Sequence, residues 1–348
     1  MTVRGWSRWP AGAGALAALL VLGTADAPGP AGAPGAAGVP GAASPSATAS
    51  PSSPAGTPRA TVTPSATATP GPVPAGATPG ICTSSTQPAL AAKLSRQIAR
   101  ALRGTTSTVG IAADDSEARV SCRYHQWQKF HSASVIKVIT LCALLHELRG
   151  RQNLSPGQAA LAQAMITESD NDAQDTLWNE IGMDALQRFL TAAGMNHTRL
   201  GQDDYWGLTE VNAHDELRLL HLLITPNHVL DTASRRYALG LMADVVPDQR
   251  WGVPAGAPPD VTVHLKNGWL PDPDLWDVNS IGDFTRRDVD YSIAILTRND
   301  PDMAYGVAVV ESVARLINRA LTQADAEATG PGAGPSPDRF RHLLYIQR

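Results

Sequence analysis

Apolar and polar residues recur with two different periods along the chain, and these periods predict helices and strands in separate blocks. Over residues 87–102, apolar side chains return at every fourth position, which predicts an amphipathic helix. Two runs of small and β-branched residues follow at 107–113 and 118–124. The polar residues 114–116 between them favour a tight turn, so the two runs predict an antiparallel hairpin.

A long apolar run at residues 131–148 predicts a buried helix that ends near Gly150. Beyond it, several short helical patterns predict an all-helical lobe over about residues 150–235. Thr209 is expected to cap the helix that starts at residue 211, with Glu210 in its first turn. The predicted helices lie at residues 157–167, 173–181, 184–193, 211–224 and 233–245.

Strand patterns return at residues 261–269, 275–281 and 291–297, and a final helix is predicted over 303–321. Because strands lie at both ends of this region, the predicted fold class is α/β (α+β), with one antiparallel sheet built from both ends of the domain. Helices flank this sheet, and the all-helical lobe is inserted into it. A cleft between two such lobes is a natural place for a ligand.

The N-terminal residues predict export. Arg4 and Arg8 precede a short apolar run that ends at Ala25-Asp26-Ala27, a small-x-small pattern typical of a signal-peptidase site. We therefore expect a secretory signal peptide over residues 1–27 and a secreted protein of the extracellular, cell-wall space. The apolar run is too short to span a bilayer comfortably, and no cysteine stands near the cleavage site. Neither a membrane anchor nor a lipid anchor is expected.

Composition divides the rest of the chain. Residues 28–81 consist almost wholly of Pro, Ala, Gly, Ser and Thr, which predicts a disordered linker because such a segment cannot bury enough apolar surface. Residues 82–325 are long enough for a sizeable core and form the predicted domain, whereas residues 326–348 are expected to be a loose tail. The net charge of −4 argues against nucleic acid as a partner. We expect a monomer.

The three cysteines leave one pairing open. Cys82 and Cys122 could form a disulfide in an oxidising exterior, whereas Cys142 lies on the apolar helix as a small buried residue. The histidines are scattered without a metal-binding spacing, and no Gly-rich phosphate loop is present. We therefore expect no metal site and no cofactor.

Ser134 and Lys137 stand three residues apart at the head of the long apolar helix. A helix places such residues on one face, so the hydroxyl and the amine can come within hydrogen-bond reach. Desolvation on an apolar segment favours the neutral amine that a base requires. By itself the pair is also compatible with a helix cap and a lysine that extends to water.

Two further segments favour a functional interpretation of Ser134 and Lys137. They are Ser169-Asp170-Asn171, between two predicted helices, and Lys266-Asn267-Gly268, on a predicted strand. Alone, the first could cap a helix and the second could hold a solvated lysine. In this order with Ser134-x-x-Lys137, they resemble the penicillin-recognising serine hydrolases (β-lactamase/transpeptidase-like), specifically class A β-lactamases, over about residues 88–322.

The resemblance implies an acyl-transfer centre. Ser134 would be the acylating nucleophile and Lys137 its base or proton relay. Ser169 would pass a proton to the leaving nitrogen, and the charge of Lys266 would attract a substrate carboxylate and favour a neutral Lys137.

The same resemblance implies the substrate-binding positions. Asn171 would hold the amide side chain of the substrate and orient Lys137. The backbone N–H groups of Ser134 and Trp269 would form an oxyanion hole, with Gly268 letting the substrate approach the strand edge.

Two positions depart from the family pattern. Asn267 stands where the family usually has Thr or Ser to bind the substrate carboxylate, although an amide can also donate a hydrogen bond. The loop at residues 201–208 is shorter than the loop that carries the family's deacylating Glu, and it contains no Glu. Asp203 or Asp204 could replace that base only by reaching the same water with a shorter side chain.

The sequence thus supports a secreted serine hydrolase that acts through a Ser134 acyl-enzyme on β-lactam-like or related amides. A first alternative is a penicillin-binding protein of the D,D-peptidase kind that is acylated without efficient turnover. A second alternative is a catalytically idle module that binds cell-wall peptide on the same fold. The expected partner is a small-molecule or peptidoglycan-peptide substrate.

Overall fold

The structure is a computed structural model that describes residues 80–115, 119–149, 153–202, 205–272, 274–286 and 289–328. All of these residues belong to one unit of the chain. The predicted signal peptide, nearly all of the predicted linker and most of the predicted tail lie outside the described residues. None of the described helices combines the length and apolar character needed to cross a bilayer.

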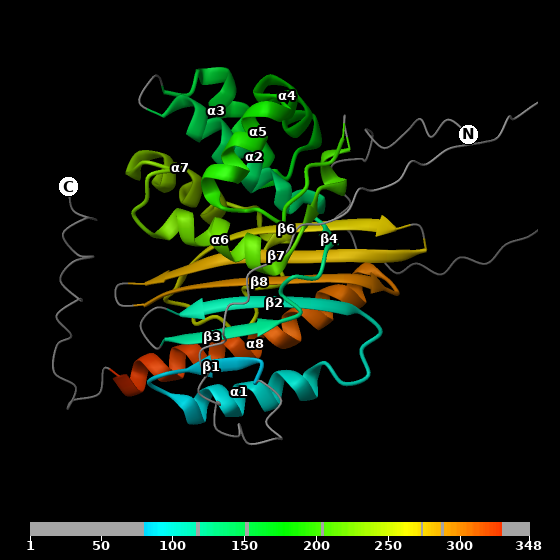
Figure 1. Ribbon diagram of the computed structural model, residues 1–348, viewed down its shortest axis with the longest axis vertical. Coiled ribbons are helices and arrows are strands. Elements are labelled where there is room, and N and C mark those ends of the chain that lie inside the picture. The colour runs from blue at the N-terminus through cyan, green and yellow to red at the C-terminus, as the bar shows by residue number, and fades with distance from the viewer. Residues whose placement is uncertain are drawn as a thin grey trace, which may run out of the picture. The chain divides into compact units, whose positions relative to one another are not determined.

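The central sheet has six antiparallel strands in the order β1-β3-β2-β8-β7-β6. Three strands come from the N-terminal side of the fold and three from the C-terminal side, which confirms the predicted sheet built from both ends (Figure 1). The strands are β1 (Cys82–Ser84), β2 (Thr108–Asp115), β3 (Val120–Tyr124), β6 (Thr262–Asp272), β7 (Leu275–Arg286) and β8 (Val289–Asp300). Two short strands, β4 (Phe130–His131) and β5 (Glu210–Val211), pair separately.

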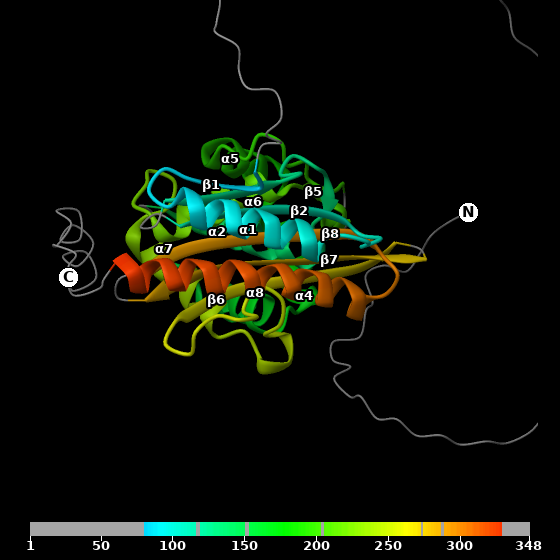
Figure 2. The ribbon, with the colours of Figure 1, turned by 90° about the horizontal axis from the view of Figure 1, so that it is seen from below.

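Helices cover both faces of the sheet. Two of them, from the two ends of the fold, lie across one face (Figure 2), and the helical lobe stands on the other (Figure 1). The first pair is α1 (Pro88–Ala101) and α8 (Met303–Ala328). The lobe contains α2 (Ile136–Leu148), α3 (Pro156–Gln163), α4 (Asn171–Ile181), α5 (Met183–Ala193), α6 (Ala213–Ile224) and α7 (Thr232–Ala243).

The sheet carries a separate apolar core on each face, because successive side chains of a strand point to opposite sides. In β2, Ala112 packs into the core of the helical lobe, whereas Ile111 and Ala113 pack into the core that α1 and α8 share. In β8, Leu296 and Ile295 divide in the same way. The alternation buries both faces of the central strands and holds the lobe firmly over the sheet.

The predicted elements are largely confirmed, with differences at their ends. The final helix extends to Ala328, and the short strands β1, β4 and β5 have no signal in the sequence strong enough to predict them. The expected Thr209 cap is wrong, because Glu210 lies in β5 and Asn212 caps α6 by accepting a hydrogen bond of 2.9 Å from the backbone N–H of Asp215. The pairing of β5 with β4 shortens the helix at that end.

The cysteine pairing that the sequence left open is resolved by strand register. Cys82 and Cys122 stand opposite each other on β1 and β3 and form a disulfide. Cys142 is free and fully buried in α2, where desolvation raises the pKa of its thiol. A disulfide in this position ties the first strand to the sheet and suits an oxidising compartment.

Glu216, in the first turn of α6, is a buried acid that the sequence did not single out. Its side chain is fully buried, and neither carboxylate oxygen has a hydrogen-bond partner. Burial, with a smaller contribution from the charge of Asp215, raises the pKa of Glu216 to about 8.

We expect Glu216→Gln to reduce the pH dependence of stability between the ordinary pKa of 4.5 and the raised value of about 8. In that window the folded wild type keeps the Glu216 proton and the unfolded chain releases it, so wild-type stability falls as pH rises. The slope for one group is at most about 1.4 kcal/mol per pH unit. Urea unfolding at both ends of this pH window measures the change in the free energy of unfolding with pH. An equal change in the wild type and in Glu216→Gln would contradict the prediction.

Candidate active site

The candidate nucleophile lies in a tight turn that connects β4 to α2. Ala133–Val135 form a single 3-10 turn that runs directly into α2. Ala133 has a φ of +47°, in the left-handed region that costs a non-glycine residue energy. The turn is held by the backbone N–H of Ser132, which donates to the carbonyl of Thr209 at 2.8 Å. The surrounding structure therefore holds Ala133, the residue directly before Ser134, in a strained conformation of the kind common at functional sites.

Lys137 brings three of the sequence motifs together. Its Nζ donates to Ser134 Oγ at 3.1 Å, as the three-residue spacing predicts. The same amine donates to Asn171 Oδ1 at 2.6 Å, to the Ser169 carbonyl at 2.7 Å and to Ser169 Oγ at 3.2 Å. The side chain is fully buried, so it does not extend to water.

Burial controls the charge of both lysines at the site. Desolvation, with help from the charge of Lys266, holds the pKa of Lys137 well below its ordinary value. Desolvation also lowers the pKa of Lys266 to about 7. The lowered pKa favours the neutral form of the Lys137 amine, which is the form that can accept a proton.

Ser169 connects the two lysines. It follows a short π-helical turn, Ala164–Glu168, and has a φ of +60°. Lys266 Nζ donates to its Oγ at 2.9 Å, and Lys137 Nζ contacts the same oxygen at 3.2 Å. The next residue, Asp170, caps α4 by accepting a hydrogen bond of 2.7 Å from the backbone N–H of Ala173. The hydroxyl of Ser169 is thus placed between two amines that can relay a proton.

Gly268 lets β6 lie directly against the nucleophile turn. A Cβ atom at this position would lie 2.7 Å from the backbone nitrogen of Ser134 and 2.8 Å from the carbonyl oxygen of Ser132. Trp269 follows on the same strand, and its ring centroid lies 5.7 Å from that of Trp251. β6 is the edge strand of the sheet, so its outer side has no strand partner among the described residues, and at Gly268 this strand approaches the turn.

The side-chain amide of Asn267, for which the resemblance implies a substrate-binding role, makes its hydrogen bonds within the protein. Its Nδ2 donates to the carbonyls of Gln249 at 2.7 Å and Trp251 at 3.0 Å. Its Oδ1 accepts a hydrogen bond of 2.6 Å from Ser280 Oγ, and the side chain is 1% exposed. Strand alternation turns Asn267 into the interior, where it holds β6 in place.

The short loop before β5 places an aromatic ring over Lys137. The Trp206 ring centroid lies 5.0 Å from Lys137 Nζ, and Trp206 Nε1 donates to Asp175 Oδ1 at 2.6 Å. Among the residues that the structure describes, no carboxylate hydrogen-bonds to the Lys137 amine or the Ser134 hydroxyl. Asp203 and Asp204 lie outside the described residues. Nothing in the sequence predicts this position of Trp206, because a lone tryptophan in a loop carries no recognisable spacing.

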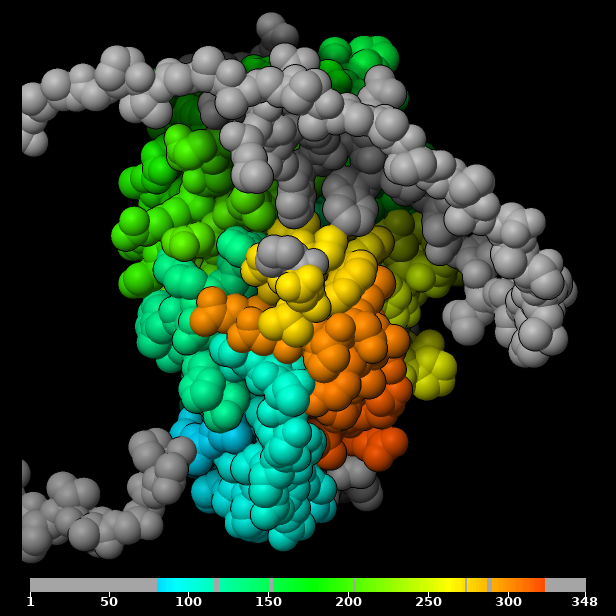
Figure 3. All heavy atoms as spheres, turned by 90° about the vertical axis from the view of Figure 1, so that its right-hand side faces the viewer, coloured from blue at the N-terminus to red at the C-terminus, as the bar shows by residue number. Residues whose placement is uncertain are grey.

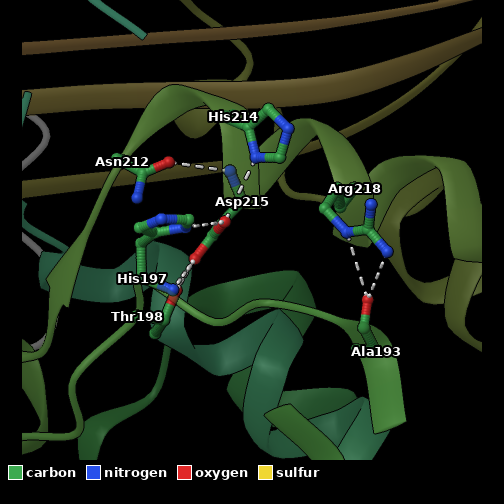
Figure 4. Close-up of polar contacts among 7 residues, drawn as sticks. All are labelled: Ala193, His197, Thr198, Asn212, His214, Asp215 and Arg218. Carbon is green, nitrogen blue, oxygen red and sulfur yellow. Dashed lines mark hydrogen bonds and ion pairs between the residues drawn. The ribbon is translucent and has the colours of Figure 1, made fainter. Parts of the chain in front are cut away.

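A buried carboxylate fixes the chain on both sides of this loop. Asp215 Oδ2 accepts hydrogen bonds from the backbone N–H of His197 at 2.9 Å and from Thr198 Oγ1 at 3.0 Å (Figure 4). The rings of His197 and His214 lie beside its other oxygen. Arg218, one turn further along α6, donates to the carbonyl of Ala193. These contacts tie the end of α5 to the head of α6 and so limit how far the loop with Trp206 can move.

Known proteins share this fold and part of this sequence. Residues 151–321 match the model of the β-lactamase enzyme family, Beta-lactamase2. A variant of PBP-A, captured as an acyl-enzyme complex with penicillin G, has a TM-score of 0.58 and 20% identity over 66% of this chain and 96% of its own. A β-lactamase from Xanthomonas campestris has a TM-score of 0.58 and 21% identity over 67% of this chain and 98% of its own.

Two further likenesses complete the comparison. A variant of the last common ancestor of Gram-negative bacteria class A β-lactamase has a TM-score of 0.58 and 24% identity over 66% of this chain and 99% of its own. LppW of Mycobacterium tuberculosis, whose name marks it as a candidate lipoprotein, is 26% identical over 172 residues, 47% of this chain and 54% of its own. The chain thus spans about half the length of the curated relatives that it matches.

The family match over residues 151–321 and the shared architecture make this chain similar to the β-lactamase/transpeptidase-like superfamily. Its fold is that of the β-lactamase-like serine hydrolases.

Proposed function

We propose that this protein is a serine hydrolase that forms an acyl-enzyme at Ser134 with β-lactam-like or related amide substrates. The observation that best supports the proposal is the 3.1 Å contact between Ser134 Oγ and the Nζ atom of a fully buried lysine, Lys137. Such a pair supplies both a nucleophile and a neutral base. The disulfide between Cys82 and Cys122 supports our further proposal that the protein acts outside the cytoplasm.

The acylation step follows from these contacts. Ser134 Oγ attacks the carbonyl carbon of the amide while Lys137 Nζ takes the hydroxyl proton. The backbone N–H groups of Ser134 and Trp269 stabilise the negative oxygen that develops. The C–N bond then breaks, and the leaving nitrogen receives a proton through Ser169 Oγ, which leaves an ester on Ser134. Lys266 in its charged form attracts the substrate carboxylate.

The loop at Trp206 favours slow release of this ester. The deacylating water of a hydrolase needs a base within hydrogen-bond reach, and the indole of Trp206 covers Lys137 on the side of this loop. We therefore retain, as a second candidate function, a D,D-peptidase-like penicillin-binding protein that is acylated without efficient turnover. An idle cell-wall-binding module on the same fold is the third.

One experiment distinguishes the three functions. The full chain is incubated with a chromogenic cephalosporin, and both colour release and intact mass are recorded. Sustained colour release supports turnover, and a stable mass increase that is absent in Ser134→Ala supports acylation without turnover. If neither colour release nor a mass increase is observed with any β-lactam or peptidoglycan peptide, acyl transfer is contradicted and the idle module is the function that remains.

We expect Trp206→Ala to shift the acylation rate toward higher pH. The acylation rate rises as Lys137 loses its proton, and burial is the main cause of the low pKa of Lys137. Removal of the covering ring admits water and raises the pKa of Lys137. The low-pH limb of the acylation-rate profile then moves to higher pH. Trp127→Ala is the matched control, because that indole is 49% exposed and does not cover Lys137. An unchanged limb in Trp206→Ala would contradict the role of the ring.

A further inference from the structure

Three side chains from distant parts of the sequence meet beside the nucleophile segment. They are His131 on β4, Asp272 at the end of β6 and Asp277 on β7. His131 Nδ1 lies 3.1 Å from Asp277 Oδ2 and 4.0 Å from Asp272 Oδ2, and all three ligand atoms lie within 4.8 Å of one another. Figure 3 looks onto the end of the sheet where the β6–β7 turn, in yellow, reaches the surface.

Asp277 is the unusual member of this group. Its side chain is 2% exposed, and its Oδ2 atom has His131 Nδ1 3.1 Å away as its ion-pair partner but accepts no hydrogen bond of good geometry. A buried carboxylate is costly unless a positive charge balances it, and at this oxygen either a protonated His131 or a bound cation supplies that charge. The pairing of β7 with β8 shifts register between Trp276 and Val278, and such irregularities re-aim side chains near functional sites.

Negative charge exceeds positive charge around His131. Besides Asp272 and Asp277, Glu210 stands directly opposite His131 in the β4–β5 register, where cross-strand side chains are neighbours. No Lys or Arg forms an ion pair with Asp272 or Asp277 among the described residues. A protonated imidazole balances only one carboxylate, whereas a divalent cation balances two.

We propose that His131, Asp272 and Asp277 form a binding site for a divalent transition-metal ion of the Zn²⁺ type. One imidazole nitrogen and two carboxylate oxygens are ligands that Zn²⁺ accepts. Ligands at Zn²⁺ distances in tetrahedral geometry lie about 3.4 Å apart, so the observed separations of 3.1 Å and 4.0 Å need only a small movement. Asp272 is 51% exposed and supplies both this movement and the access from solvent.

The bound ion would link two elements of the candidate active site. His131 lies three residues before Ser134, and the other two ligands lie on the hairpin whose first strand carries Gly268 and Trp269. Asn279 already connects them, because its Nδ2 donates to the carbonyls of His131 and Ser132. The ion is therefore a structural tether, and the reaction at Ser134 has no step that uses it.

Titration of the metal-free full chain with Zn²⁺ tests the proposal. We expect calorimetry to show one bound ion per chain and a rise in melting temperature, and Co²⁺ to give the visible absorption of a low-symmetry N/O site. Asp272→Asn, a substitution at an exposed position that folding tolerates, and His131→Gln should each weaken binding at least about tenfold, since even outer-shell substitutions cost that much.

Two control variants make the same kinds of substitution, Asp to Asn and His to Gln, at residues outside the cluster. Asp274→Asn changes an exposed carboxylate of the same turn, and His125→Gln changes an exposed imidazole. Both should bind Zn²⁺ as the wild type does. The proposal is overturned if the wild type binds no Zn²⁺, if Mg²⁺ binds in preference, or if the cluster variants and the controls bind equally. The cluster would then be an ion pair between His131 and Asp277 only.

Discussion

We expect Lys137→Met to lower the rate of acylation at Ser134 by about 10²- to 10⁴-fold, the range that a positioned general base contributes. Methionine preserves the length of the side chain and removes the amine that contacts Ser134 Oγ at 3.1 Å. The measurement is the rate of mass increase with penicillin G at several pH values. Wild-type acylation should rise with pH through the lowered pKa of Lys137, and the residual rate of the variant should lack that limb.

The variant should remain folded, which separates loss of the base from loss of the fold. A buried thioether avoids the desolvation cost of an amine, although it leaves Asn171 Oδ1 and the Ser169 carbonyl without a donor. Lys93→Met, at an exposed position of α1, is the control and should acylate as the wild type does. Normal acylation of Lys137→Met would contradict the assigned base.

We expect Gly268→Ala to reduce acylation by about 10²-fold or more and to destabilise the fold by about 1–3 kcal/mol. The added Cβ would lie 2.7 Å from the backbone nitrogen of Ser134, closer than real Cβ contacts come. Either β6 or the nucleophile turn must move, and the proposed oxyanion hole uses a backbone N–H from each. Acylation rate and urea unfolding measure the two effects.

Gly240→Ala is the matched control for this substitution. Gly240 lies within α7 and nothing lies within 4 Å of a Cβ built there. Alanine should stabilise this helix by about 0.5–1 kcal/mol and leave acylation unchanged. If Gly268→Ala behaved like Gly240→Ala, the close approach of β6 to the turn would not be needed for the reaction.

The order of elements and the contact between Ser134 and Lys137 could be predicted because both depend on local spacing. The contact between Ser134 and Lys137 follows from the three-residue step of a helix. Ser169 and Lys266 followed only from the resemblance of three segments taken together, since each segment alone has a simpler explanation. The Thr209 cap was wrong because a two-residue strand, β5, pairs with β4 and takes the positions assigned to the helix.

Other features depend on contacts between distant residues and have no local signal. Asn267 faces the interior because Gln249, Trp251 and Ser280 accept and donate its hydrogen bonds. Trp206 covers Lys137 because the loop that carries it is short and fixed at both ends.

The sequence by itself determined the helical lobe between two groups of strands, the contact between Ser134 and Lys137 and the likeness to the β-lactamases, because periodicity and short motifs are local properties of a chain. Only the tertiary structure decided the complete burial of Lys137, the inward turn of Asn267 and the meeting of His131 with Asp272 and Asp277. The physical reason is that desolvation and charge balance depend on which side chains come together in space. Residues that are more than a hundred positions apart reveal this only when the sheet brings them side by side.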